Sequence, residues 1–184
     1  MRNRNDRGAS LVEAGVLLPV IILLAIGLSE IGFLGVDFLT VTNAAREGAR
    51  TGASAADYDI GSVDADDLIA EAVEQAACNL QFGSLTEVRV FKSDANGGEI
   101  DPFGGVNVYQ PGIAGLNCSN SANGLNCVNG CPWAPSGRDR ATPGLDNIGV
   151  TVIFNHDGVT GLFPFPTVAW DETAVMQIEP DTRG

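Results

Sequence analysis

A single glutamate stands at the start of a long apolar run, where its carboxylate has few groups to interact with. Glu13 lies in "RGASLVEAGVLLP", residues 7–19, and the 23 residues that follow it, 14–36, contain one charge, Glu30. An ionisable side chain in a membrane-spanning segment costs a few kcal/mol and indicates a function. The alternative is a solvated Glu13 in the first turn of a helix, where its charge complements the helix dipole.

The peptide bond between Gly8 and Ala9 is a candidate cleavage site. Cutting it would remove residues 1–8, a basic leader that holds three arginines and one aspartate. Glu13 would then become the fifth residue of the mature chain, and Ala9 would carry a new charged amine.

The apolar run that follows must position these residues. As a helix with a rise of about 1.5 Å per residue, residues 14–36 span roughly 35 Å, which crosses a bilayer with some tilt. The arginines precede the run and an acidic segment follows it. The positive-inside rule then predicts a single-pass protein of the cytoplasmic membrane, with its N-terminus in the cytoplasm and residues beyond about 37 outside.

A cleavable secretory signal is the main alternative for this run. Ala25-Ile26-Gly27 imitates the small residues that precede a signal-peptidase cut, and the mature chain would begin near Leu28. The apolar pattern nevertheless continues through "IGFLGVDFLTV" (31–41) and into the alanine-rich "TNAAREGARTGAS" (42–54). A signal peptide has no reason to extend into such a helix, so a retained helix over residues 9–54 is favoured.

Residues 7–54, about a quarter of the chain, resemble a known family. The stretches "RGASLVEAGVLLPVIILLAIGLSEIGFL" and "TNAAREGAR", with Leu18-Pro19 inside the apolar run, are similar to the TadE-like family of minor pilins. The resemblance implies a non-enzymatic minor pilin or pseudopilin, without a cofactor, that assists assembly or initiation of a tight-adherence (Flp-type) pilus. The implied partners are a prepilin peptidase, other pilins, the pilus assembly platform and the lipid bilayer.

The resemblance also gives roles to individual residues. A prepilin peptidase would cut after Gly8, and Glu13 would face the N-terminal ammonium of a neighbouring subunit. This pairing would lower the cost of both charges in a low dielectric and fix the axial register between helices. Pro19 lacks an N–H and clashes with the carbonyl four residues back, so we expect a kink near Gly15; the alternative is a tolerated membrane proline.

Two alternatives place the protein in other classes. It could be a membrane-anchored extracytoplasmic binding module that does not polymerise, with an uncut Gly8. It could also be a secreted enzyme or lectin that is released after Gly27.

Residues 55–184 are strongly acidic. They contain 18 Asp and Glu but only 5 Lys and Arg. Binding to nucleic acid needs clustered Lys and Arg that neutralise phosphates, so nucleic acid is excluded as a partner. The simplest reading of the excess acid is a solvated surface on an extracytoplasmic domain.

All four cysteines lie after the apolar run: Cys78, Cys118, Cys127 and Cys131. An even number outside the cytoplasm favours disulfides, and four cysteines allow three pairings. A zinc site is weakly supported because the chain has no C-x-x-C pair and one histidine, His156, and we expect no metal. Free buried thiols are the remaining alternative.

The acidic segment predicts an α+β domain. Residues 63–80, "VDADDLIAEAVEQAACNL", fit a helix with Asp64 as its cap and an apolar stripe. Residues 85–93, 146–156 and 171–180 alternate as strands do. We therefore expect one helix packed on an antiparallel sheet of three or four strands, with His156 in a turn between strands.

A long segment between these elements is rich in Gly, Asn and Pro. Residues 96–144 are expected to form an irregular loop that holds three of the cysteines. A displayed loop that contacts partners and an ordered spacer both remain open. A second, shorter connector, "GLFPFPTVAW" (161–170), is expected between two strands.

Overall fold

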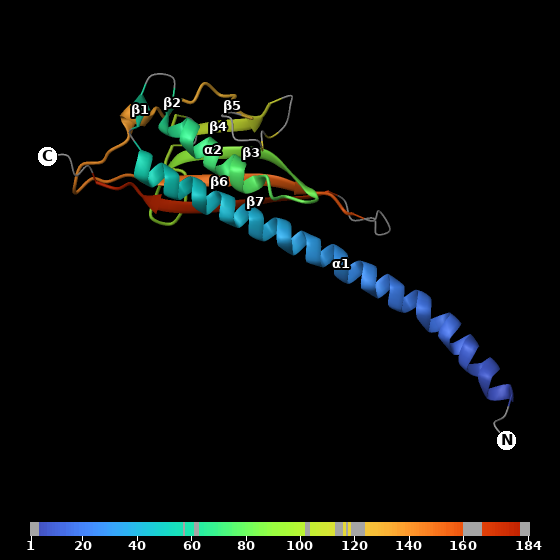
Figure 1. The fold of residues 1–184 in the computed structure, drawn as a ribbon. Coiled ribbons are helices and arrows are strands. Elements are labelled where there is room, and N and C mark those ends of the chain that lie inside the picture. Colours follow the sequence, from blue (N-terminus) through green and yellow to red (C-terminus); the bar gives the residue numbers. More distant parts are fainter. Residues whose placement is uncertain are drawn as a thin grey trace.

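The protein consists of one long helix and a body at its C-terminal end (Figure 1). The helix is α1 (Arg4–Ala55), and the body contains a shorter helix, α2 (Ala65–Ala77), and a five-stranded antiparallel sheet. The fold class is therefore α+β with a long apolar N-terminal helix, as the sequence predicts. The computed structural model describes residues 4–56, 58–60, 63–101, 104–112, 116, 118, 124–159 and 167–180.

The sheet has the strand order β5-β4-β3-β6-β7 and is antiparallel throughout. A separate two-stranded ribbon, β1 and β2, leads into α2, and a 3-10 turn, η1, follows β5. The bounds are β1 (Asp59–Ile60), β2 (Val63–Asp64), β3 (Gly83–Ser93), β4 (Val106–Pro111), β5 (Leu125–Cys127), η1 (Pro135–Gly137), β6 (Asn147–His156) and β7 (Val168–Gln177).

The expectation of three or four strands and of an irregular segment over residues 96–144 was wrong. This segment supplies two strands of the sheet, β4 and β5, together with η1. The strands β3, β6 and β7 are the three that alternation indicated. The strand β4 was missed because it has six residues, is preceded by glycines and ends in a proline, so its pairing with β3 decides its conformation.

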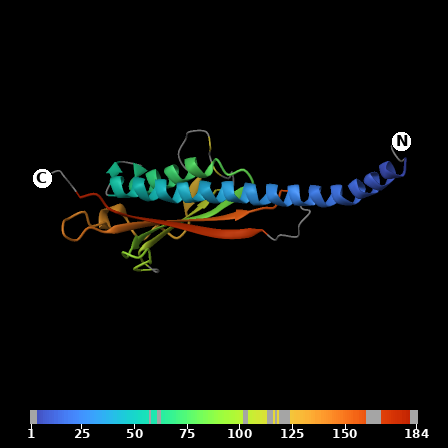
Figure 2. The same ribbon diagram turned by 90° about the horizontal axis from the view of Figure 1, so that it is seen from below.

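Both helices cover the same face of the sheet, which makes the body a two-layer structure (Figure 2). The C-terminal half of α1 is therefore part of the body and not only its stalk. It contributes small buried residues, which let the helix lie close to α2 and the sheet. The core residues include Val41, Ala44, Ala45, Ala49 and Ala53 of α1, Ile69 and Val73 of α2, and Val88, Val90, Val150, Val152 and Phe154 of the sheet.

The start of α2 follows from its first residues. Asp64 has extended backbone angles, and its side chain accepts hydrogen bonds from the backbone N–H of Asp66 (2.9 Å) and of Asp67 (3.0 Å). The Asp67 side chain accepts the Asp64 N–H in return (3.1 Å), which completes a capping box. The cap expected from the sequence is confirmed.

The N-terminal half of α1 projects away from the body (Figures 1 and 2). The span Ser10–Ala55 of α1 contains an 18-residue window that has a mean hydropathy of 2.6 and is not buried at any residue. By length and composition this helix can cross a membrane. The helix continues through Gly15 and Pro19 without a break and curves along its free half.

Candidate functional site

The residues expected to act in processing and assembly lie together at the free end of α1. Gly8 and Glu13 are exposed, and Ala9 lies between them in the same helix. Gly8, Val12, Glu13, Val16 and Leu17 line one shallow, open surface. The first three residues of the basic leader lie outside the described part of the chain.

Gly8 has no packing role among the residues that the structure describes. A Cβ added at this position would meet no atom within 4 Å, because the surrounding helix surface is open. A larger side chain at Gly8 is therefore compatible with the fold. A requirement for glycine at this position would have to come from another molecule.

The free half of α1 ends where a buried acid, Asp37, attaches the helix to the body. The Asp37 side chain is fully buried, and its Oδ1 and Oδ2 accept the backbone N–H of Gln81 (3.0 Å) and of Phe82 (3.3 Å). Its Oδ2 also lies 2.8 Å from Nδ1 of His156, which is buried at the end of β6. A buried carboxylate with three polar partners fixes the helix along its axis and around it.

Glu30 lies two turns before Asp37 in α1. Of these two acids, it contacts the body nearer to the free end of the helix. Its Oε2 accepts the backbone N–H of Val159 (3.0 Å), and it is only 8% exposed. Phe33 packs on Phe82 beside it, with ring centroids 4.7 Å apart. Contacts with the body therefore begin inside residues 14–36, and residues 11–25 are exposed along roughly 22 Å of helix at about 1.5 Å per residue.

Sequence reasoning missed this attachment. The expectation of a turn at His156 was wrong, since this residue ends β6 and is buried against α1. A signal was nevertheless present: Glu30 and Asp37 are seven residues apart and share one helix face in an otherwise apolar stretch. Two acids on one face of such a helix indicate polar partners elsewhere in the chain.

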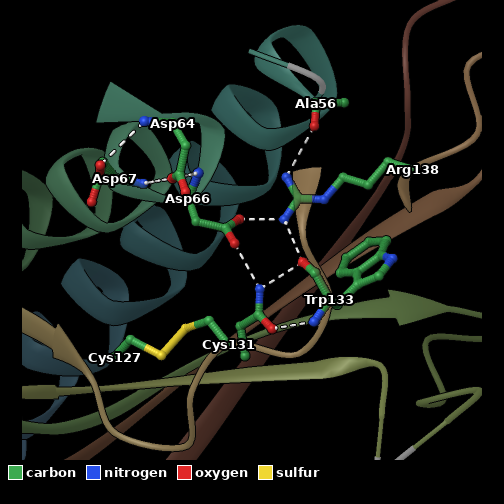
Figure 3. Close-up of polar contacts among 9 residues, drawn as sticks. Ala56, Asp64, Asp66, Asp67, Cys127, Cys131, Trp133 and Arg138 are labelled. Carbon is green, nitrogen blue, oxygen red and sulfur yellow. Dashed lines mark hydrogen bonds and ion pairs between the residues drawn. A yellow bond between two sulfur atoms is a disulfide. The ribbon is translucent and has the colours of Figure 1, made fainter. Parts of the chain in front are cut away.

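A second buried polar cluster joins α2 to the segment 96–144 (Figure 3). Asp66 of α2 pairs with Arg138 and accepts a hydrogen bond from Asn107 Nδ2 at 2.6 Å. Asn107 also donates to the carbonyl of Trp133 and accepts its N–H, both at 2.8 Å. Arg138 donates to the carbonyl of Ala56 (3.1 Å) and lies over the Trp133 ring.

This cluster has a structural role. Burial raises the pKa of the Asp66 carboxyl above its ordinary value, and the charge and hydrogen bond of Arg138 oppose that rise. Of the side chains that contact Asp66, Arg138 donates to the carbonyl of Ala56, the residue directly after α1, and Asn107 donates to the carbonyl of Trp133. The cluster thus holds the segment 96–144 against α2 and against the end of α1. Among the described residues there is no group of three or more His, Cys, Asp or Glu that could hold a metal ion.

The four cysteines form two disulfides. Cys78, at the C-terminal cap of α2, pairs with Cys118, and Cys127 pairs with Cys131. The sequence left three pairings open together with zinc and free thiols, and the structure leaves no free cysteine. The first disulfide ties the segment 96–144 to α2 at a second point, beyond the Asp66 cluster.

Comparison with known proteins bears on α1 alone. The family model described as TadE-like protein matches residues 8–50, which include Gly8, Glu13 and the body contacts of Glu30 and Asp37. No curated protein and no solved structure matches the chain. The resemblance predicted from the sequence is thus confirmed over residues 8–50, and the N-terminal helix of this chain is similar to that of TadE-like proteins.

Proposed function

We propose that the protein is a minor pilin or pseudopilin that takes part in the assembly or initiation of a tight-adherence, Flp-type pilus. The observation that carries this proposal is the free half of α1. It is apolar and exposed, it is continuous with the body, and it has Gly8, Ala9 and Glu13 at its far end. The TadE-like match over residues 8–50 supports the same role, which is structural and not enzymatic.

In this proposal a prepilin peptidase cuts the bond between Gly8 and Ala9. Residues 1–8 leave, and Ala9 gains an ammonium group four residues before Glu13. The ammonium of one subunit and the Glu13 carboxylate of its neighbour then pair at the inner edge of the apolar layer, where either charge alone is costly. Because the pair requires two helices at one axial offset, it sets the register of the assembly.

The proposal places the free half of α1 in the cytoplasmic membrane, with the N-terminus inside and the body outside. The apolar residues 14–36 span roughly 35 Å as a helix, which is enough to cross the hydrocarbon core of a bilayer with some tilt. The arginines before the helix and the acidic body after it favour this direction.

The fold alone is compatible with the two alternatives. A cut after Gly27 would leave Glu30, Asp37 and the buried alanines of α1 on the body, so a secreted domain could keep its core. An uncut chain would be an anchored module that does not polymerise. The position at which the mature protein begins therefore distinguishes the proposed pilin from the anchored module and from the secreted domain.

The test is the mass and N-terminal sequence of the membrane-fraction protein, with and without a co-expressed prepilin peptidase. We expect a start at Ala9 that depends on the peptidase. A start near Leu28 would overturn the membrane anchor, and an intact N-terminus beside an active peptidase would leave the anchored module.

A matched pair of variants makes this test specific. Gly8→Leu and Gly15→Leu both place a large apolar side chain at an open position of the free helix, where an added Cβ meets no atom within 4 Å. Gly8→Leu should abolish the cut, whereas Gly15→Leu should be processed as the wild type is. Equal processing of the two variants would contradict recognition at Gly8.

A further inference from the structure

Two aromatic side chains from distant parts of the sequence meet on the surface of the body. Phe38 of α1 and Trp170 of β7 lie edge to face, with ring centroids 5.7 Å apart and an interplanar angle of 82°. Phe154 of β6 supports Trp170 from within the core, with centroids 6.2 Å apart. Trp170 is thus held on two sides, yet 38% of its surface and 37% of that of Phe38 remain exposed.

This aromatic pair lies toward the end of the body from which the free half of α1 leaves, because Phe38 directly follows the attached Asp37 and Trp170 is near the start of β7. Trp170 is opposite Phe154, two residues before His156, which holds Asp37. The hairpin end beyond it reaches Glu30 through the N–H of Val159.

An apolar face of α1 runs past the first body contacts and ends beside this pair. Its members follow helical spacing and are exposed by 61–70%: Leu28, Ile31 and Leu39. The next exposed residues along α1 are polar, beginning with Asn43 and Arg46. On β7, Asp171 and Glu172 follow Trp170 directly. The apolar surface of both elements therefore stops at the same level.

We infer that Trp170 and Phe38 form an interfacial anchor that seats the body in the headgroup layer of the bilayer. This rests on the proposed membrane span of α1. If Glu13 marks the inner edge of a hydrocarbon core about 30 Å thick, its outer edge lies about 20 residues later, near Phe33. Phe38 follows about 7.5 Å beyond, within the interfacial layer, where Trp and Tyr are enriched.

The polar groups on the membrane side of the pair are compatible with this position. Glu30, Asp37 and His156 are buried and bound within the protein. Asp157 is exposed, and its carboxylate accepts a hydrogen bond from the Thr167 hydroxyl (2.9 Å). This arrangement leaves the aromatic pair and the apolar face of α1 to contact lipid.

The chain offers its own control, because its two tryptophans lie in different environments. Trp133 is 8% exposed and lies over Arg138 in the buried cluster. The full-length protein is reconstituted in zwitterionic phosphatidylcholine vesicles, and flotation shows whether it is membrane-bound. Lipids brominated at shallow or deep acyl positions are then used to quench tryptophan emission.

We expect the Trp133→Phe variant, in which Trp170 is the only tryptophan, to lose emission with brominated lipid, and more with shallow than with deep bromine. The Trp170→Phe variant, which retains Trp133, should not be quenched. The difference between the wild type and Trp170→Phe isolates Trp170 even if Trp133→Phe fails to fold.

Each other outcome overturns the inference. Quenching of Trp170 by aqueous iodide but not by brominated lipid would place it in water. Protection of Trp170 from both quenchers would indicate that a second protein chain covers it. Failure of the protein to float would remove the membrane span itself, whereas flotation without lipid quenching would remove only the aromatic anchor.

Discussion

Asp37 of α1 and His156 of β6 are 119 residues apart in the sequence, yet Oδ2 of the first lies 2.8 Å from Nδ1 of the second, with both side chains buried. Asp37 also accepts the N–H groups of Gln81 and Phe82. One side chain therefore joins the helix to the sheet and to the connection that follows α2.

Replacing Asp37 by alanine should strongly destabilise the body. The substitution leaves two backbone N–H groups and one imidazole without their buried acceptor, and losses of this kind are about 3 kcal/mol. Urea unfolding of the full chain in a mild detergent measures this change. Asp171→Ala, at an exposed position of β7, is the control and should change stability by about 0.5 kcal/mol or less.

Substitution of Glu13 should separate assembly from folding. Glu13→Gln keeps the size of the side chain but removes the charge that would pair with a neighbour's ammonium, so we expect normal insertion and processing with severalfold fewer surface pili. Glu47→Gln is the matched control, because Glu47 is exposed on the same helix and forms an exposed ion pair with Arg50 (3.8 Å). Pili would be counted by electron microscopy, and equal counts for both variants would contradict the role of Glu13.

The two disulfides should differ in their contribution to stability. The Cys78–Cys118 bond spans 40 residues and the Cys127–Cys131 bond spans four. Loop-closure entropy then gives about 4 kcal/mol for the first and about 2 kcal/mol for the second. Double serine variants of each pair, compared by denaturant unfolding, should show this order, and a larger loss from the short loop would contradict it.

Gly48 should tolerate no side chain. A Cβ at this position would lie 2.5 Å from Cγ2 of Val73 and 3.1 Å from Cγ1 of Val150, at the point where α1 meets α2 and β6. We expect Gly48→Ala to destabilise the body by about 1–3 kcal/mol through overpacking. Gly35→Ala, at an open position of the same helix, should be neutral or stabilising by up to about 1 kcal/mol, and equal effects would contradict this packing.

Asp94 should titrate below its ordinary value of 3.8. The backbone N–H groups of Gly98 and Asn96 donate to its Oδ1, both at 2.8 Å, and these bonds lower the pKa of the carboxyl. Because the folded value is the lower one, the stability that Asp94 contributes is present at neutral pH and is lost as the pH falls through the lowered pKa. Carboxyl-carbon NMR titration of the full chain measures this value, and a pKa at or above 3.8 would contradict the prediction.

Elements defined by local patterns could be predicted from the sequence. The cap of α2 depends on Asp64 and Asp67, three residues apart, and β3, β6 and β7 alternate along their own length. Alternation could not reveal β4, because its conformation depends on pairing with β3 across a glycine-rich connection.

The buried polar contacts could not be predicted from local sequence patterns, because their partners lie far apart in the chain. Asp66 and Arg138 are 72 residues apart, and no periodicity links them. The cysteine pairing was equally undetermined, since spacing alone permits three connectivities. At the free end of α1 the residues and their order could be read from the sequence, whereas the attachment at Glu30 and Asp37 depends on partners far along the chain.

The unbroken course of α1 from its free end into the core has a mechanical consequence. The helix lies along the sheet over its last turns, so traction on its free end loads that contact in shear (Figure 2). The buried residues from Val41 to Ala53 would then resist together, rather than yielding one after another as in peeling. Because α1 is continuous from its free end into the core, force and torque applied to that end reach the body through the helix itself and not through a separate linker.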